Sequence, residues 1–138
     1  MATVEILDIS GDVGLEVQAD DLYDLFEGVA SGMFGLITNT ADIQEKTERR
    51  ITIHSRDIDN LVIAWLNELI FIFDTDGLVP RRYEFYELTE DSVDGRIVGE
   101  EFNPQIHERR LLIKAATYHD FEIKRIGSMW WLKVIFDI

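Results

Sequence analysis

The chain has 138 residues, no cysteine, and a formal net charge of −14 from 27 acidic and 13 basic side chains. Its length is close to the most common domain size, so we expect a single domain over residues 1–138. The absence of cysteine excludes disulfides, thiolate zinc sites and cysteine nucleophiles, and the acidic balance disfavours tight direct binding of nucleic acid, because phosphate would be repelled.

The first 40 residues predict a strand pair followed by a helix. Residues 4–9 and 13–18 alternate between apolar and polar side chains, and Gly11-Asp12 between them is typical of a turn. Asp20 or Asp21 is then placed to cap a helix, because apolar residues recur with a period of 3.6 residues up to residue 37.

A second strand and helix follow. Residues 47–55 alternate as a strand with Ile51 and Ile53 on one face. Ser55 or Asp57 opens the second helix, which runs to about residue 73 with an apolar stripe that includes Trp65. The polar sequence of residues 74–77 ends it. We interpret Trp65, like the Gly32-Met33-Phe34 segment of the first helix, as core.

The second half of the chain is predominantly β. We expect strands at residues 78–88, 95–101, 111–114, 118–126 and 129–137, with Gly127-Ser128 at the last hairpin turn. Residues 89–110 are polar and interrupted by glycine and proline, so we expect a small, β-rich peripheral insertion there. The predicted fold class is α+β, with two helices packed on a largely antiparallel β-sheet.

The carboxyl-terminal end is apolar up to its last residue, which indicates a terminus held in a sheet rather than a frayed one. Such an end places the Asp137 side chain beside the α-carboxylate of Ile138. Two neighbouring carboxylates repel each other unless a proton or a cation lies between them, and oxygen ligands suit hard cations such as Ca²⁺ or Mg²⁺. The chain end is therefore a candidate metal site.

The sequence also bears on cellular location. No apolar stretch is long enough to span a bilayer, since the best one, residues 61–73, is short and contains Asn67 and Glu68. The residues after Met1 lack the basic and apolar regions of a signal peptide. We expect a cytoplasmic protein with no membrane partner.

Several motifs, taken together and in order, resemble the archease family. The matching segments are Asp12-Val13-Gly14, Gly32-Met33-Phe34, Trp65-Leu66-Asn67-Glu68-Leu69, Phe73-Asp74, Lys114-Ala115-Ala116-Thr117-Tyr118-His119 and Phe136-Asp137-Ile138. They are distributed over nearly the whole chain. The six-residue segment that begins at Lys114, combined with the short acidic terminus, is the specific part of the resemblance.

The resemblance implies a protein cofactor and not an enzyme. Archeases assist the RtcB-type RNA ligase, which uses GTP and Mn²⁺ to join RNA ends, as in tRNA splicing. The ligase forms a guanylylated histidine of its own, and archease promotes that step and sustains multiple turnover. The partner implied for this chain is thus an RtcB-type RNA ligase.

The resemblance also implies site residues. Asp12, Asp137 and the Ile138 carboxylate match the family's metal-binding positions, with Ca²⁺ as the ion expected in a structure and Mg²⁺ or Mn²⁺ as alternatives. Asp12 alone would be interpreted as an Asx-turn residue. Lys114 is expected to orient a nucleotide phosphate or the ligase's acidic metal ligands. His119 is a ligand, a proton carrier or a hydrogen-bonded residue behind the site.

One motif departs from the family pattern. The family's first motif usually begins His-Thr-Ala-Asp, whereas this chain has Ile9-Ser10-Gly11-Asp12. The carboxylate is kept and the histidine is not, so any role of that histidine is absent or is supplied differently.

Two other functions fit the same residues. A metal-dependent phosphohydrolase would use Asp12 and Asp137 to hold the ion and Lys114 to stabilise phosphate charge, although a two-metal site needs more carboxylates than we can place together. An acidic chaperone or interaction module would use the terminal carboxylates only structurally. His54 and His107 have no partner at metal-ligand spacing, and we assign them no role.

Overall fold

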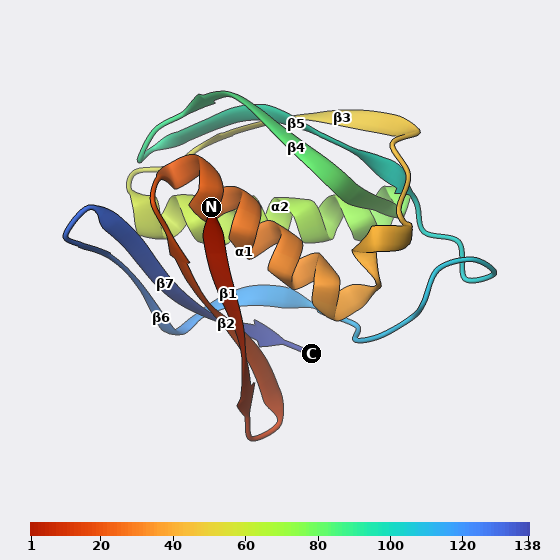
Figure 1. Cartoon of the computed structure of the whole chain (residues 1–138), viewed down its shortest axis with the longest axis horizontal. Coiled ribbons are helices and arrows are strands. Elements are labelled where there is room, and N and C mark those ends of the chain that lie inside the picture. Colours follow the sequence, from red (N-terminus) through yellow and green to blue (C-terminus); the bar gives the residue numbers. More distant parts are fainter.

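The computed structural model describes residues 1–138, and its strands form two separate antiparallel sheets with two α-helices between them (Figure 1). Sheet A has the strand order β1-β2-β7-β6, and sheet B has the order β3-β5-β4. The elements in chain order are β1 (Ala2–Ile9), β2 (Asp12–Ala19), α1 (Leu22–Ile37), a 3₁₀ turn (Thr40–Asp42), β3 (Thr47–His54), α2 (Ile58–Asp76), β4 (Leu78–Leu88), β5 (Ser92–Glu101), β6 (Ala115–Ile126) and β7 (Met129–Asp137). The predicted α+β class is confirmed, with two sheets where one was expected.

Each helix begins at one of the two capping residues that the sequence offered, α1 at Asp21 and α2 at Asp57. The Asp21 side chain accepts a hydrogen bond from the Asp24 amide at 2.8 Å, and the Asp57 side chain accepts one from the Asn60 amide at 2.9 Å. Each bond satisfies a backbone donor that has no partner within the helix. Helix α2 continues three residues past the expected end and stops at Gly77, whose φ of 72° is the left-handed conformation common at helix ends.

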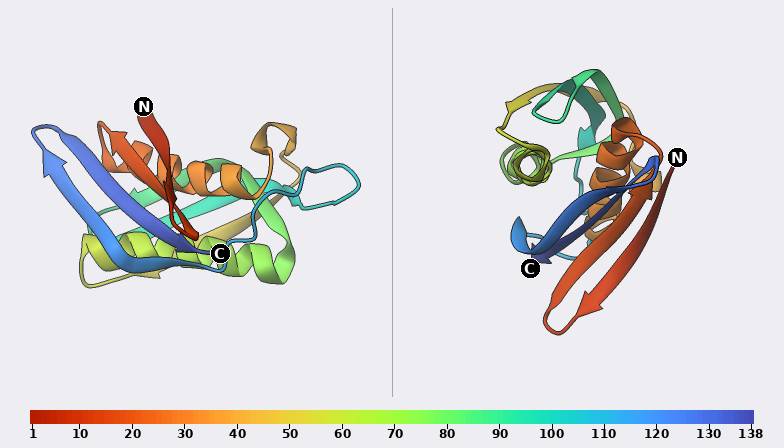
Figure 2. Two further views of the ribbon diagram at one scale, coloured as in Figure 1. Left: turned by 90° about the horizontal axis from the view of Figure 1, so that it is seen from below. Right: turned by 90° about the vertical axis from the view of Figure 1, so that its left-hand side faces the viewer.

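The helices share one hydrophobic core with both sheets. Helix α1 packs on β1, β2 and β4, and α2 packs on β6 and on all three strands of sheet B, as the end-on view in Figure 2 shows. Met33, Phe34 and Trp65 are buried, so the predicted core stripes are confirmed. The Trp65 indole donates to the Phe26 carbonyl at 3.1 Å and joins the two helices. Neither helix is long and apolar enough to cross a membrane.

Sheet A brings distant parts of the chain together. The last hairpin turns at Gly127-Ser128 as predicted, with Ile126 opposite Met129 and a positive φ of 64° at Gly127. Strand β7 lies between β2 and β6. The antiparallel pairing therefore places the start of β2, the end of β7 and the start of β6 at the same end of the sheet.

The expectation of a peripheral insertion at residues 89–110 is wrong for residues 92–101. These residues form β5, which is the central strand of sheet B. Two glycines of β5 explain why this segment is a central strand and why its sequence suggested a loop. A Cβ at Gly99 would lie 1.8 Å from the Val79 carbonyl oxygen, and a Cβ at Gly95 would lie 2.3 Å from the Glu84 carbonyl oxygen. These glycines are required by the close approach of β4, whereas in the sequence they resemble loop residues.

The strand expected at residues 111–114 is also absent. The amides of Arg110 and Leu111 donate instead to the carbonyls of Ile37 and Leu36 at 3.0 and 2.9 Å. Those carbonyls belong to the last turn of α1 and have no partner within the helix. Residues 110–111 thus cap α1, and the apolar run at 111–113 belongs to no strand.

Candidate functional site

Asp12 and Asp137 lie at the same end of sheet A, each one position beyond the last register pair of β2 with β7. Asp12 is the first residue of β2 and Asp137 the last of β7, and the paired positions next to them are Val13 and Phe136. Both of these neighbours are buried in the core. Because side chains alternate along a strand, the two carboxylates project from the opposite, outer face.

Lys114 reaches the same end of the sheet from β6. Ala115 pairs with Asp137, and the Lys114 amide donates to the Asp137 carbonyl oxygen at 2.8 Å. The Lys114 residue is exposed. Ile138 follows Asp137 directly and is also exposed, so the terminal carboxylate lies next to this group. The structure therefore brings together Asp12, Asp137, Ile138 and the main chain of Lys114.

His119 is not part of this group. Its register position lies beyond Thr117, which pairs with Ile135, and the pairing of β6 with β7 is irregular from there to Glu122. The imidazole is 75% exposed, and its Nε2 atom lies 3.4 Å from a carboxylate oxygen of Asp120. A hydrogen-bonded residue behind the site was one of the roles expected for His119. The structure leaves this histidine exposed on an irregular edge strand, where it is available to solvent or to a partner.

The residues at this end of sheet A have the right kind of ligand atom for a metal ion but supply too few ligands. No group of three His, Cys, Asp or Glu side chains is placed to hold a metal ion. Asp12, Asp137 and the terminal carboxylate offer only oxygen atoms, the ligands of hard cations, whereas Ca²⁺ takes about six to eight oxygens. Water or groups from another molecule would have to complete the coordination.

Ile9 occupies the position beside Asp12 where a histidine would be expected. The two residues are paired across the β1–β2 turn, so their side chains lie on the same face. Ile9 is half-buried, and its side chain has no atom that can bind a metal or carry a proton. In this chain Asp12 therefore has an apolar neighbour on that side.

One polar residue near this group was not assigned a role from the sequence. The Asn67 amide of α2 donates to the Ala116 carbonyl at 3.1 Å and accepts from the Ala116 amide at 2.8 Å. Ala116 lies within the segment that starts at Lys114. The signal in the sequence was an asparagine within the mainly apolar stretch of residues 61–73, since such a residue needs a hydrogen-bond partner when it is half-buried.

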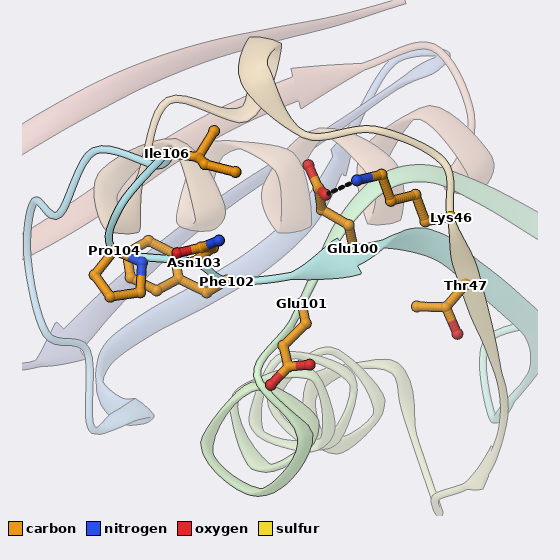
Figure 3. Close-up of a pocket in the computed structure, with 8 residues that line it drawn as sticks. All are labelled: Lys46, Thr47, Glu100, Glu101, Phe102, Asn103, Pro104 and Ile106. Carbon is orange, nitrogen blue, oxygen red and sulfur yellow. Dashed lines mark ion pairs between the residues drawn. The ribbon is translucent and has the colours of Figure 1, made fainter.

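The largest cleft lies elsewhere. It has a volume of about 570 Å³ and is formed by residues 46–47, the end of β5 and the loop after it (Figure 3). The Glu100 carboxylate in its wall accepts hydrogen bonds from the Gln44 amide at 3.0 Å and from His107 Nε2 at 2.9 Å, and Lys46 Nζ lies 3.2 Å away.

These hydrogen-bond partners determine the pKa of Glu100 and the position of the ring proton of His107. The Gln44 amide, and then His107 and Lys46, lower the pKa of Glu100 below the usual 4.5, although desolvation opposes them. The Asn103 amide donates to His107 Nδ1 at 2.9 Å, so the ring proton is on Nε2 and is donated to Glu100. The Glu100 carboxylate thus holds the loop through these bonds. None of the predicted site residues lines this cleft.

Comparison with known proteins is consistent over the whole chain. The sequence model described as the Archease protein family matches residues 5–138. The chain is 32% identical over 139 residues to the protein archease of Sulfolobus acidocaldarius, covering 100% of both chains. It is also 32% identical to that of Pyrococcus furiosus over 133 residues, covering 94% of each.

Two solved structures share the fold. The solution structure of protein 1598 from Methanobacterium thermoautotrophicum has a TM-score of 0.80 and 34% identity, with 98% of each chain covered. The crystal structure of an archease from Thermotoga maritima, described as a possible chaperone, has a TM-score of 0.63 and 21% identity, with 96% of this chain and 94% of that chain covered. The second likeness concerns the fold alone.

Proposed function

This chain belongs to the archease family, and from that premise we propose that it activates an RtcB-type RNA ligase in the cytoplasm. In this proposal the chain promotes guanylylation of the ligase and sustains multiple turnover without joining RNA itself. The observation that carries the proposal is the meeting of Asp12, Lys114 and Asp137, which come from three separate segments, at one exposed end of sheet A.

The chemistry of this end suits contact with a metal- and nucleotide-dependent enzyme. Asp12, Asp137 and the terminal carboxylate are acceptors, and they would hold a hard divalent cation whose remaining ligands come from water or the ligase. Such a cation would neutralise the repulsion between the carboxylates and the ligase's own acidic ligands. We propose Ca²⁺, Mg²⁺ or Mn²⁺ for this position.

Lys114 supplies the opposite charge. The Lys114 main chain is fixed to Asp137, and its ammonium group at this end of the sheet can bind a phosphate oxygen or an acidic ligand on the partner. Arginine would not replace it well, because a planar guanidinium is broader than a compact ammonium. His119, at the irregular part of β6, is then a contact residue at the margin of this surface.

The test compares single variants in a guanylylation assay with the partner ligase. Asp12→Asn, Asp137→Asn and Lys114→Ala should each leave a folded protein and reduce stimulation of guanylylation at least tenfold. Asp8→Asn is the matched control. It removes a nearby exposed carboxylate on the opposite face of the same hairpin, where Asp8 pairs with Val13, and should retain full stimulation.

The same preparations separate the alternative functions. Hydrolysis of phosphoesters by the purified protein alone would favour the phosphohydrolase, although the structure assembles too few carboxylates for a two-metal site. Full stimulation by all three variants would contradict the proposed site. Suppressed aggregation of unfolded proteins, without any effect on guanylylation, would favour a chaperone.

A further inference from the structure

Helix α2 takes the place of a missing strand beside β6. Strand β6 is an edge of sheet A, so one side of it has no strand to pair with. At Ala116 both main-chain polar groups are bound by the Asn67 side chain, with N···O distances of 2.8 and 3.1 Å. A primary amide has one acceptor and two donor positions on the same group, so it can copy the two bonds that a neighbouring strand would make.

A second asparagine of α2 contacts the same segment. Asn60 precedes Asn67 by seven residues, which is two helical turns, so both side chains project from one face of α2. The Tyr118 hydroxyl donates to Asn60 Oδ1 at 2.5 Å. Helix α2 therefore holds β6 at Ala116 through the main chain and at Tyr118 through the side chain.

Pairing with β7 is short at this end of β6. Only three register pairs, at Ala115, Ala116 and Thr117, precede the irregularity that extends to Glu122. Within the irregular part Asp120 has a positive φ of 52°. Edge strands with few ladder bonds open easily, and Lys114 lies just outside the first of these pairs. The Asn67 bonds lie two residues from Lys114, at the pair formed by Ala116 and Phe136.

We propose that Asn67 is a positioning residue that keeps the Lys114 end of β6 in register with Asp137, and that ligase activation depends on this register. Only the dependence of ligase activation on this register rests on the proposed function. Asn67 does not reach the outer face itself, since it binds the helix-facing edge of β6. It acts through Lys114 and Asp137, whose relative placement it maintains.

The first measurement is amide hydrogen exchange, followed by NMR, in Asn67→Ala. The amides of Ala116 and Lys114 should exchange about tenfold faster or more. The Ala116 amide loses its hydrogen-bond acceptor, and the Lys114 amide lies in a strand end that Asn67 no longer holds against β7. Asn39→Ala is the matched control. Asn39 is also half-buried and also accepts from a backbone amide, that of Ala41 at 3.2 Å; its loss should leave both amides unchanged.

Asn67→Asp tests the two-point bond itself and guards against a variant that simply fails to fold. An ionised carboxylate can accept from the Ala116 amide, but its second oxygen repels the Ala116 carbonyl. Protonation of the introduced group restores a donor. Protection of Ala116, corrected for intrinsic exchange, should therefore recover as pH falls in Asn67→Asp and not in Asn67→Ala.

The second measurement is stimulation of ligase guanylylation in a double-mutant cycle. If Asn67 acts through Lys114, then Asn67→Ala lowers stimulation and Asn67→Ala/Lys114→Ala is no worse than Lys114→Ala alone. A purely structural contribution would add to the loss. Thermal unfolding of each variant shows the folded fraction at the assay temperature.

The outcomes are distinguishable. Unchanged protection of Lys114 in Asn67→Ala overturns the inference, whether or not the wild-type chain activates a ligase. Lost protection with unchanged or additive stimulation overturns the dependence of activation on register. Failure of the wild-type chain to stimulate any RtcB-type ligase overturns the proposed function, while the exchange result still decides the positioning role of Asn67.

Discussion

Tyr83 shows how a single buried polar group can remain unsatisfied. Its hydroxyl is buried without a hydrogen-bond partner, and its ring lies against Trp65 with a centroid distance of 6.3 Å. Burial raises the pKa of Tyr83, and the nearby charge of Glu27 raises it further. The hydroxyl is therefore neutral and costs desolvation free energy that no partner atom of the chain returns.

We expect Tyr83→Phe to raise the free energy of unfolding by about 1 kcal/mol, because it removes the unpaired hydroxyl and keeps the ring. Urea unfolding measures the change. Tyr86→Phe is the control on the same strand, since Tyr86 is 53% exposed and its hydroxyl is free to bind water; its effect should stay within about 0.5 kcal/mol. A loss of stability in Tyr83→Phe would show that the hydroxyl is bound.

At the scale of elements, the segment from residue 102 to 114 links the two sheets without being a strand itself. Its first part is held to sheet B by the His107–Glu100 hydrogen bond, and its last part caps α1 through Arg110 and Leu111. The Arg110 guanidinium also donates to the Gly35 carbonyl at 2.8 Å. This connection delivers Lys114 to the end of β7.

The lowered pKa of Glu100 makes this connection sensitive to acid. A carboxyl whose folded-state pKa lies below its unfolded value contributes stability that is present above pH 4.5 and is lost as pH falls through the lower, folded pKa. Glu100→Gln should therefore be less stable than the wild type at neutral pH, and the difference should close as pH falls below 4.5.

Thermal unfolding as a function of pH measures this difference. Glu101→Gln is the matched control, because Glu101 is the next residue of β5 and is exposed; it should show no gap that closes with acid. A constant difference between Glu100→Gln and the wild type across the acid range would contradict a stabilising ionised Glu100.

At the scale of the whole molecule, the two sheets differ in how they use charge. The outer face of sheet B carries a chain of ion pairs that joins Glu45, Arg82, Glu84, Arg96 and Glu48. These contacts neutralise basic residues with acidic ones. At the end of sheet A, by contrast, Asp12, Asp137 and the terminal carboxylate lie near one another. Part of the net negative charge of the chain is therefore concentrated at this one place by the fold.

A neutral extension of the carboxyl terminus tests the role of this end in the intact molecule. Added residues convert the Ile138 carboxylate to an amide and move the new carboxylate away. We expect weaker binding of a divalent cation and weaker ligase activation, because the donor set loses one charge. Calorimetric titration with Ca²⁺ provides the measurement.

The same extension at the amino terminus is the control. Met1 lies at the other end of β1, since Ala2 pairs with Ala19 while Ile9 pairs with Asp12. Equal cation affinity in the two extended proteins would show that the terminal carboxylate is not a ligand, even if Asp12 and Asp137 prove necessary.

The sequence by itself determined the features that depend on neighbours along the chain. These are the helix starts, to within two candidate caps each, the apolar stripes of both helices and the turn at Gly127-Ser128. All are local, because capping, helical period and turn geometry each involve only a few consecutive residues. The family motifs, including the segment from Lys114 and the acidic terminus, could also be found in the sequence.

Only the tertiary structure decided the features that depend on contacts between distant segments. Gly95 and Gly99 belong to a central strand because β4 approaches them closely, and residues 110–111 cap α1 because its last carbonyls need donors. Asn67 bonds to Ala116 from 49 residues away. The pattern of a single segment carries no record of such a partner, so the meeting of Asp12, Lys114 and Asp137 at one sheet end is a property of the folded chain.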